Sequence, residues 1–420
     1  MPQAIQEMIR SKAQTAKAAK RTLSKTSVDV RNGALLAMAD SILTFKNKIQ
    51  EANRLDLEEG RKTGLADPLM QRLELDEKKI ARMADNLRQV AALPDPIGEV
   101  SHIRERPNGL QIGRVSVPIG VVGVIYESRP DVTVEVSALC IKSGNGVILR
   151  GGSEAIHSNT ALANILSETT EREGIPGAIQ FVDITDRQAV HEMIALPDLI
   201  DLIVPRGSYE LVRYLMKQSE IPVLGHADGI CHVYIDQTAD IGMAEEICIN
   251  AKSGYKVAVC NAMETLLVHE KIAPNFLPSM CEKFAAEGVE LRGCENTLAI
   301  CPDLLPATEE DWRTEYLDYI LSIRIVSDFD AAVDHIETYG SHHSDTIVTE
   351  NYTAAQRFLK EVDSAAVYVN ASTCFTDGYE FGLGAEVGIS TQKLHCRGPM
   401  GLEGLTSYKY MVYGNGQLRT

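Results

Sequence analysis

The sequence lacks both a long apolar run and an excess of positive charge. None of its apolar stretches approaches the roughly 20 residues that a membrane-spanning helix needs. Over 420 residues the formal net charge is −17, and a negative field repels nucleic-acid phosphates and anionic lipid headgroups. We therefore expect neither nucleic acid nor a membrane as a partner, and an anionic ligand would need a local cationic site.

The nine cysteines lack the patterns of a disulfide framework or a zinc site. Their number is odd, no CxxC occurs, and no cysteine or histidine pair has zinc-ligand spacing. We therefore expect reduced thiols, no metal ion and a cytoplasmic location. Three cysteines lie in strand or helix patterns and are expected in the core, namely Cys140, Cys231 and Cys248.

The common nucleotide-binding fingerprints are missing as well. No GxGxxG follows a first strand, and no GxxxxGK[ST] occurs. The nearest match, GLGAEVG at residues 382–388, has the wrong last interval and lies late in the chain, so we interpret it as a structural loop.

The hydrophobic pattern predicts a helical start followed by two α/β series. Residues 1 to about 95 are predicted to be helical, and strand-like and helical runs then alternate over 119–230 and again over 231–370. Such alternation is typical of doubly wound, mostly parallel sheets. The predicted strands of the first series are IGVVGVIYE, GVILRG, AIQFVD and IDLIVP; the second series includes CHVYIDQ, METLLVH, LAICPD, ILSIRIV and SAAVYVN.

Apolar side chains recur at helical spacing in three segments of the helical start. The predicted faces are Ile5, Met8, Ile9 and Ala13; Leu35, Leu36, Met38, Ala39, Ile42, Leu43 and Ile49; and Ile80, Met83, Ala84, Leu87, Val90 and Ala91.

Two β segments have no place in either series. Residues 103–117 alternate around Pro107-Asn108-Gly109, which indicates a hairpin. The run TSYKYMVYG at 406–414 predicts a final strand. Because neither segment has a core of its own, we expect both to reach another subunit of a homo-oligomer.

Cations follow two predicted strands of the first series. Arg150-Gly151-Gly152 comes after GVIL, and Arg206-Gly207-Ser208 comes after DLIVP. A cation and bare amides just before a helix suit a phosphate, although a structural role stays open for each motif. Arg129 either holds a substrate anion or belongs to a structural ion pair.

Cys260 lies in a loop between a predicted helix and a predicted strand. Functional residues concentrate in loops, and the backbone amides of Cys260 and Asn261 could stabilise an oxyanion beside the sulfur. A buried, unreactive thiol is the alternative. Among the histidines, we interpret His226 near Asp228 as a loop pair rather than a dyad, and His342-His343 as a solvated loop pair.

Several long runs resemble the γ-glutamyl phosphate reductases, also called glutamate-5-semialdehyde dehydrogenases, of the aldehyde dehydrogenase superfamily. They include NAKSGYKVAVCNAMETLLVH, DLIVPRG and the block from DSAAVYVN to GLTSYKY, and the resemblance extends from about residue 4 to the C-terminus. It implies an α/β fold of two doubly wound domains with a β oligomerisation arm, and a nicotinamide cofactor bound without GxGxxG.

The resemblance also implies domains. Residues 1–98 and 118–229 would bind the cofactor, with a late return near 381–395, and residues 230–380 would be catalytic. The segments 99–117 and 396–420 would be oligomerisation elements.

Site residues follow from the same resemblance. Cys260 matches the catalytic cysteine, Arg150 stands where a lysine binds the adenosine phosphate, and Glu315 stands where a glutamate holds the nicotinamide ribose. Loop 371–377, which includes Cys374, matches the substrate-anchoring loop. The full implied set for the cofactor is Arg150, Gly151, Arg206, Gly207, Ser208 and Glu315, and for the substrate Ser128, Arg129, Asn370, Ser372 and Thr373.

The sequence departs from the aldehyde-oxidising members of the superfamily. They carry an asparagine before the proline that matches Pro130, where this chain has Ser128-Arg129, and Asp131 replaces an expected asparagine. They also carry a glutamate base in Glu-Leu-Gly-Gly, where this chain has Val223-Leu224-Gly225-His226. A reductase that starts from an acyl phosphate needs no base to activate water.

The implied reaction is the NADPH-dependent reduction of L-glutamyl 5-phosphate to L-glutamate 5-semialdehyde and phosphate through a Cys260 thioester, the second step of proline biosynthesis. Because this acyl phosphate is labile, the resemblance also suggests a glutamate 5-kinase as partner. Two alternatives stay open, namely NAD(P)-dependent aldehyde oxidation and a non-catalytic nucleotide-binding protein.

Overall fold

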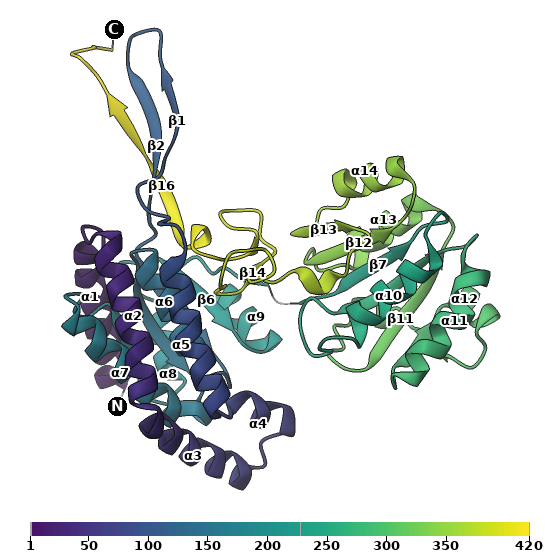
Figure 1. Cartoon of the computed structure of the whole chain (residues 1–420), viewed down its shortest axis with the longest axis horizontal. Coiled ribbons are helices and arrows are strands. Elements are labelled where there is room, and N and C mark those ends of the chain that lie inside the picture. The colour runs from purple at the N-terminus through teal and green to yellow at the C-terminus, as the bar shows by residue number, and fades with distance from the viewer. Residues whose placement is uncertain (1, 227, 420) are drawn as a thin grey trace. The chain divides into compact units, whose positions relative to one another are not determined.

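The computed structural model describes residues 2–226 and 228–419 and has a mixed α/β architecture (Figure 1). The chain divides into two compact units. Unit 1 comprises Met1–Gly225, Gly382–Gly388 and Pro399–Thr420, and unit 2 comprises His226–Phe381 and Ile389–Gly398. No helix in these described stretches is long and apolar enough to cross a membrane.

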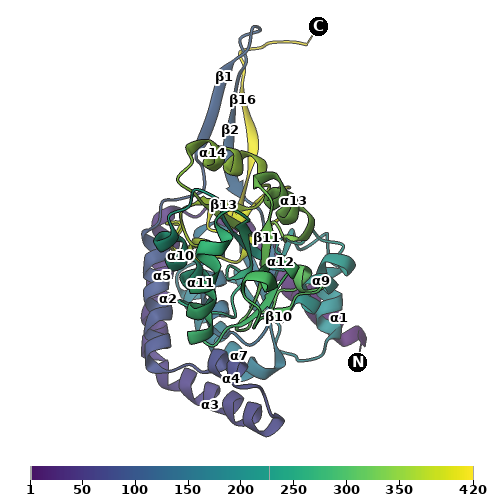
Figure 2. The ribbon, with the colours of Figure 1, turned by 90° about the vertical axis from the view of Figure 1, so that its right-hand side faces the viewer.

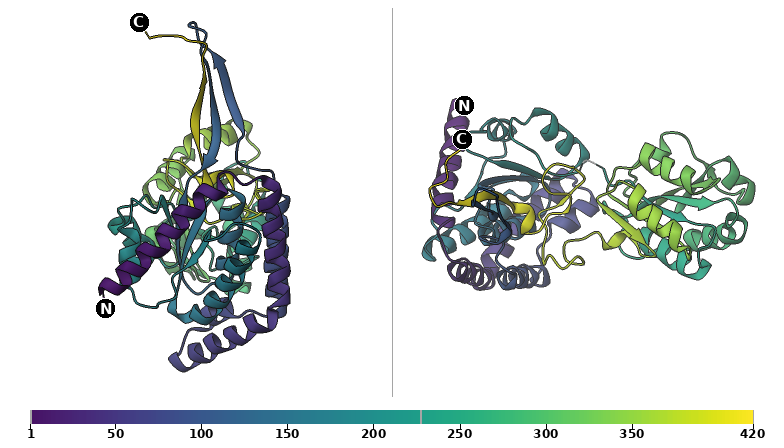
Figure 3. Two further views of the ribbon diagram at one scale, coloured as in Figure 1. Left: turned by 90° about the vertical axis from the view of Figure 1, so that its left-hand side faces the viewer. Right: turned by 90° about the horizontal axis from the view of Figure 1, so that it is seen from above.

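The sheet of unit 1 is parallel, as predicted. Its strands lie in the order β5 (Ile179–Phe181), β4 (Gly146–Gly151), β3 (Val121–Tyr126) and β6 (Leu202–Arg206). Strands β3 and β4 are buried along their whole length, which is typical of a parallel sheet covered by helices. Helices α1 (Pro2–Leu23), α8 (Gln188–Ile194) and α9 (Tyr209–Gln218) share a core cluster with this sheet (Figure 3, where α1 is the purple helix ending at N).

A second helical layer of unit 1 packs around α6 and α7. Helices α2 and α5 contact α6, and α2 and α3 contact α7. The bounds of this layer are α2 (Val28–Thr44), α3 (Lys46–Thr63), α4 (Asp67–Leu73), α5 (Glu77–Ala92), α6 (Asp131–Lys142) and α7 (Ile156–Arg172).

The predicted apolar face of α5 is confirmed, because all six of its residues are buried. The face predicted for α2 is partly wrong. Leu36 and Leu43 are 46% and 37% exposed, since they lie seven residues apart on a row just beside the buried stripe. Ile49, predicted on that face, belongs instead to α3, because the chain turns at Phe45.

The predicted hairpin and final strand are both present in unit 1. Strands β1 (Val100–Glu105) and β2 (Gln111–Pro118) pair antiparallel, and β16 (Thr406–Tyr413) pairs with the other edge of β2. Figures 1 and 2 show this three-stranded arm extending away from the helices of unit 1. Five of its apolar and aromatic side chains are more than half exposed, namely Ile103, Tyr408, Tyr410, Val412 and Tyr413.

The sheet of unit 2 has seven parallel strands. Their order is β10 (Leu305–Pro306), β9 (Glu290–Gly293), β11 (Ile320–Val326), β8 (Met263–His269), β7 (Cys231–Ile235), β12 (Ser344–Val348) and β13 (Ala366–Val369). Side chains alternate between its faces. Val233 and Ile235 join the cluster under α10 (Ile241–Lys252) and α11 (Ala273–Ala286), whereas Tyr234 joins the cluster under α13 (Phe329–Tyr339) and α14 (Tyr352–Glu361).

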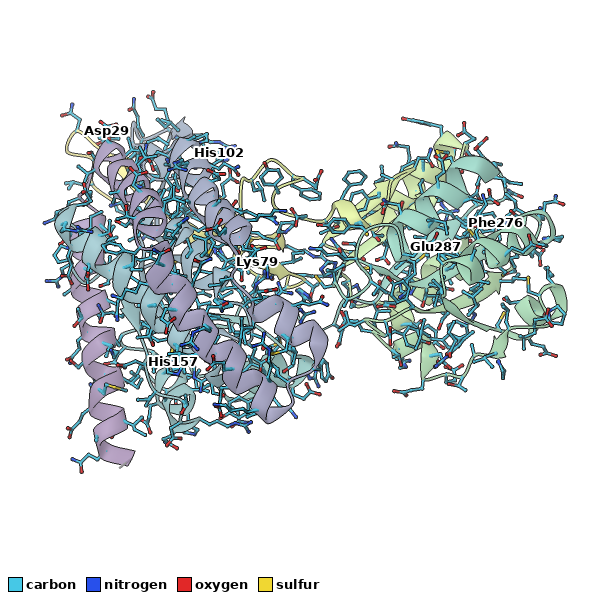
Figure 4. The ribbon with its side chains drawn as sticks, turned by 60° about the horizontal axis from the view of Figure 1, so that its bottom comes forward. Asp29, Lys79, His102, His157, Phe276 and Glu287 are labelled. Carbon is cyan, nitrogen blue, oxygen red and sulfur yellow. The ribbon has the colours of Figure 1, made fainter. Side chains whose placement is uncertain are left out.

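Some elements of unit 2 were not predicted. Strands β9 and β12 and helix α11, which buries Phe276 (labelled in Figure 4), were missed, and the run 298–303 contains the end of α12 (Glu295–Ile300) rather than a strand. Strand β12 begins with Ser344, Asp345 and Thr346, which are polar yet fully buried. The backbone of β12 pairs with β7 and β13, and the Asp345 carboxylate accepts from the His232 amide. A local hydrophobic pattern in the sequence does not reveal these distant partners. The short strands β14 (Ile389–Ser390) and β15 (Gly398–Pro399) complete the fold.

Candidate active site

Cys260 lies in a turn just before β8 of unit 2 and is half-buried. Strand β7 lies between β8 and β12, so the amino ends of these three strands are neighbours. Cys231, at the start of β7, donates from Sγ to the Cys260 carbonyl oxygen over 3.2 Å. Three of the remaining cysteines are fully buried, which confirms the predicted core positions of Cys140, Cys231 and Cys248.

Two histidines lie beside Cys260. One potential ligand atom from each of His226, Cys260 and His343 lies within 4.8 Å of the other two. The two imidazole rings meet edge to face with centroids 4.8 Å apart. His343 is fully buried, so its interpretation as half of a solvated loop pair was wrong. The three residues come from separate segments of the chain, and their spacing in the sequence could not reveal the cluster.

Hydrogen bonds engage the Nδ1 atom of both histidines. His226 Nδ1 lies 2.7 Å from the Ile389 carbonyl oxygen. A carbonyl only accepts, so Nδ1 carries a hydrogen and, in the neutral ring, Nε2 has the lone pair. His343 Nδ1 bonds to Ser344 Oγ at 2.8 Å, while its buried Nε2 has no hydrogen-bond partner among the described residues. His226 can thus offer Nε2 as a base or ligand, and His343 can do so in the tautomer that carries its hydrogen on Nδ1.

Glu315 is connected to the Cys260 turn through Gly229. The Gly229 amide donates to Glu315 Oε1 over 2.9 Å. Burial raises the pKa of the Glu315 carboxyl to about 7, against the opposing effect of nearby His226. The predicted ribose ligand therefore lies in the same unit as Cys260, and its carboxyl group can change charge near neutral pH.

The predicted substrate loop packs directly behind the Cys260 turn. Thr373 Oγ1 donates to the Asn261 carbonyl oxygen over 2.7 Å, and Asn261 Nδ2 donates to the carbonyl oxygens of Cys374 and Thr376. Ser372 Oγ accepts from the Cys374 amide. The side chains of Ser372 and Thr373, assigned to the substrate by resemblance, are therefore engaged in holding the loop itself.

Asn370 has a comparable local role. Its backbone is left-handed, with φ of 54°. Its side-chain amide bonds to both the N–H and the carbonyl oxygen of Thr349. The Cys260 and Asn261 amides, in contrast, have no backbone carbonyl as acceptor within the described stretches. These two amides remain suited to an oxyanion.

The cationic residues predicted in unit 1 meet at the carboxyl edge of its sheet. Tyr126 at the end of β3 pairs with Gly151 on one side and Arg206 on the other. Arg150 Nη2 donates to the Thr185 carbonyl oxygen over 3.0 Å, while its buried Nε has no hydrogen-bond partner in the described residues. Burial lowers the pKa of Arg129, and the neighbouring guanidinium groups of Arg206 and Arg72 lower it further.

The helix N-termini at this edge already have anionic partners. Glu127 Oε2 accepts from the Ser208 amide at the start of α9 over 2.7 Å. Asp56 accepts from the amides of His157 (labelled in Figure 4) and Ser158 at the start of α7. Ser128 donates from its amide and its hydroxyl group to Glu154. A carboxylate at a helix N-terminus opposes a second anion there, so the arginine side chains suit a phosphate better than the Ser208 amide does.

Known proteins resemble this chain over nearly its whole length. A family model described as "Aldehyde dehydrogenase family" matches residues 1–302. The gamma-glutamyl phosphate reductase of Thermodesulfovibrio yellowstonii is 53% identical over 416 residues, which is 99% of each chain. The crystal structure of the gamma-glutamyl phosphate reductase of Thermotoga maritima has a TM-score of 0.96 at 46% identity, covering 98% of this chain and 100% of that one. An engineered glycolyl-CoA reductase with bound NADP+ has a TM-score of 0.67 at 16% identity, covering 96% of each chain, and shares the fold.

Proposed function

Because the chain belongs to the gamma-glutamyl phosphate reductases of the aldehyde dehydrogenase family, we propose that it reduces L-glutamyl 5-phosphate to L-glutamate 5-semialdehyde, with release of phosphate. This is the second step of proline biosynthesis. The observation that supports it most is the Cys260 turn, where a half-buried thiol adjoins two backbone amides that lack a backbone acceptor in the described residues.

Cys260 is the nucleophile of the proposed reaction. Its thiolate attacks the γ-acyl carbon, a carbon–sulfur bond forms, and phosphate leaves with the electrons of the broken carbon–oxygen bond. The amides of Cys260 and Asn261 stabilise the oxyanion that develops on the acyl oxygen. After reduction of the thioester, the carbon–sulfur bond of the thiohemiacetal breaks, which releases the semialdehyde and restores the thiolate.

A nicotinamide cofactor supplies the hydride when it is bound, and we propose NADPH. The residues of unit 1 fit a phosphate-bearing cofactor, because Arg150 has a buried Nε without a described partner and Arg129 lies near two further guanidinium groups. In this proposal Arg150, Gly151, Arg206, Gly207 and Ser208 contact the nucleotide. Glu315 accepts from the nicotinamide ribose.

The proposal extends to domain roles and surroundings. Residues 1–98 and 118–229, with the return near 381–395, bind the cofactor, and residues 230–380 are catalytic. Segments 99–117 and 396–420 join subunits of a homo-oligomer. The nine free cysteines fit a reducing cytoplasm, where a glutamate 5-kinase would supply the labile substrate. Ser128 and Arg129 are the proposed substrate contacts of unit 1, and Asn370, Ser372 and Thr373 hold the shape of the loop that we propose to anchor the substrate in unit 2.

The reverse reaction tests the proposed function. Purified protein is mixed with glutamate 5-semialdehyde and NADP+, with or without phosphate, and the absorbance of NADPH is followed. We expect NADPH to form only with phosphate, because Val223-Leu224-Gly225-His226 lacks the glutamate that activates water in aldehyde-oxidising members.

Three outcomes separate the candidate functions. Formation without phosphate would instead indicate aldehyde oxidation, and no formation under either condition would indicate a non-catalytic nucleotide-binding protein. Cys260→Ala should abolish turnover and leave the Kd for NADPH nearly unchanged. A Cys260→Ala variant that keeps substantial activity would contradict the assigned nucleophile.

A further inference from the structure

The proposed reaction gives no role to the two imidazoles that lie beside Cys260, those of His226 and His343. Two imidazoles and a thiol converge in unit 2, with one donor atom of each within 4.8 Å of the others. We propose that this cluster binds Zn²⁺, or a similar thiophilic divalent cation, and that the bound cation inhibits the enzyme reversibly. The inhibitory part rests on the proposed role of Cys260 as nucleophile, whereas the binding part does not.

The donor set matches zinc in its chemistry. Zn²⁺ favours thiolate sulfur and imidazole nitrogen, in contrast to Mg²⁺ and Ca²⁺, which favour oxygen. Tetrahedral zinc with bonds of about 2.0–2.3 Å needs donor atoms about 3.3–3.7 Å apart. The present upper separation of 4.8 Å therefore requires only a small inward rotation of the side chains.

Both histidines have the supporting contacts of metal ligands. A metal-bound histidine usually donates its other ring N–H to a carbonyl or another oxygen, which fixes the tautomer and the ring. His226 donates from Nδ1 to the Ile389 carbonyl oxygen. His343 Nδ1 bonds to Ser344 Oγ, which lies 2.6 Å from Thr376 Oγ1, and that hydroxyl lies 2.7 Å from the Tyr368 hydroxyl.

The buried Nε2 of His343 points independently to a ligand. His343 is fully buried, and this nitrogen has no hydrogen-bond partner in the described part of the chain. An unpaired polar atom in such a place costs free energy unless something binds it. A cation that coordinates this nitrogen would satisfy it, as three protein ligands leave a fourth position for water.

Coordination and catalysis compete for the same sulfur atom. Binding of the cation releases the proton of the Cys260 thiol to solvent and engages the thiolate electron pair in the metal–sulfur bond. That pair is then unable to attack an acyl phosphate. Zinc and the acyl or aldehyde substrate should therefore exclude one another.

Cobalt(II) provides a direct probe of the site, because a thiolate–cobalt bond gives a charge-transfer absorption in the near ultraviolet. The full chain is reduced, freed of metal and titrated with Co²⁺ alone, without substrate or cofactor. We expect one equivalent to produce the band and Zn²⁺ to remove it. Cys260→Ser should abolish the band, and His226→Gln and His343→Gln should each weaken Co²⁺ binding at least tenfold.

His342→Gln is the matched control, since His342 adjoins His343 in sequence but is outside the cluster and bonds to the Asp363 carbonyl oxygen. It should bind Co²⁺ like the unaltered chain. Absence of the band, its persistence in Cys260→Ser, or equal losses in His342→Gln and His343→Gln would overturn the site. Substitutions at two separate histidines keep the test valid if one variant misfolds.

Inhibition is measured separately in the phosphate-dependent reverse assay with buffered free Zn²⁺. Inhibition that increasing semialdehyde relieves supports the proposal, and inhibition that semialdehyde does not relieve overturns its competitive part. A charge-transfer band in a protein without phosphate-dependent activity would refute the proposed function and leave the metal site intact.

Discussion

Gly229 lies against the backbone of Cys260 so closely that no larger residue fits. A Cβ atom placed on Gly229 would lie 2.1 Å from the Cys260 carbonyl oxygen and 2.6 Å from its Cα. These atoms belong to backbone and cannot rotate away. The glycine therefore fixes the position of the proposed nucleophile, while its own amide holds Glu315.

Gly229→Ala should displace Cys260 and reduce turnover. A displacement of about 1 Å at a reacting atom lowers a rate by about 100-fold, and we expect a loss of kcat of that order. Steady-state kinetics of the reverse reaction gives the value. The matched control is Gly242→Ala, at the start of α10, where a Cβ atom would meet only Asp240 Oδ1 at 3.4 Å. Equal activities of the two variants would contradict the proposed constraint.

Thr373→Val should loosen the support of the Cys260 turn. The substitution keeps the shape of the side chain but removes the hydroxyl group that donates to the Asn261 carbonyl oxygen. Loss of a partner for a buried polar group costs about 1–3 kcal/mol, and we expect kcat to fall about tenfold as the turn relaxes. Thr373→Ser, which retains the hydroxyl group, should recover most of the activity. If valine and serine variants are equally active, this bond does not support catalysis.

The affinity for NADPH should increase as the pH rises through 7. Burial raises the pKa of Glu315 to about 7, so its carboxyl group is protonated below that pH and becomes a charged acceptor above it. Hydrogen bonds to a charged acceptor are the stronger ones. Between pH 6 and pH 8 we expect Kd to fall up to about tenfold, measured by fluorescence titration of NADPH.

Glu315→Gln should remove this part of the pH dependence, and exposed Glu310→Gln should retain it. The comparison of the two variants subtracts the titration of the cofactor's own phosphate. Identical pH profiles for both would argue against a Glu315 contact with the ribose.

Lys252→Met should destabilise unit 2. Lys252 Nζ lies 2.6 Å from Glu264 Oε2, and both side chains are fully buried. Removal of one partner from a buried ion pair costs about 3–5 kcal/mol. Burial raises the pKa of Glu264 to about 7, so the carboxyl group left behind can take up a proton at acidic pH. The loss of stability should therefore be smaller at pH 6 than at pH 8.

Urea unfolding followed by tryptophan fluorescence measures this change, because the single tryptophan, Trp312, is buried in unit 2. The double variant Lys252→Met, Glu264→Leu should recover part of the lost stability, since it leaves no unpaired charge. A single variant with an unchanged urea midpoint at pH 8 would show that the pair contributes little.

Deletion of residues 102–115 should reduce the mass per particle in solution by more than the mass of the deleted residues, because fewer subunits associate. The deletion removes most of β1 and part of β2, and so exposes the edge of β16, whose aromatic side chains are already more than half exposed. Light scattering of the full chain and the deletion variant decides the matter. An unchanged number of subunits per particle would contradict the proposed role of the arm in oligomerisation.

The sequence predicted the fold and the family well because their signals are local or continuous. Each strand of the parallel sheet of unit 1 coincides with an apolar run. Helix α5 buries every residue of its predicted face, and the antiparallel arm was predicted from Pro107-Asn108-Gly109 and the final alternating run. Strand β12 was missed because its polar residues are satisfied by other strands, as when Asp345 accepts from the His232 amide. Leu36 and Leu43 were wrongly predicted to be buried, because the sequence pattern does not distinguish an apolar residue beside the buried stripe of a helix from one within it.

The surroundings of Cys260 were harder to predict than Cys260 itself. Its loop position and the family resemblance made the residue a candidate nucleophile, but the order β8, β7, β12 that brings His343 beside it depends on long-range strand pairing. The sequence likewise did not predict that Glu127 and Asp56 accept from the amides at the starts of α9 and α7, because these carboxylates come from distant segments of the chain. Sequence spacing reports neighbours along the chain, and this site is built from neighbours across a sheet.

The strand order of unit 2 has a consequence for how the protein comes to be reactive. Cys260 precedes β8, while His343 immediately precedes β12, a strand that is synthesised more than 80 residues later and pairs with β7. Contacts between residues so distant in sequence form late, because a long loop must close first. A nascent or partly folded chain would thus carry an ordinary thiol, and the environment of the proposed nucleophile would arise only as the centre of the sheet is completed.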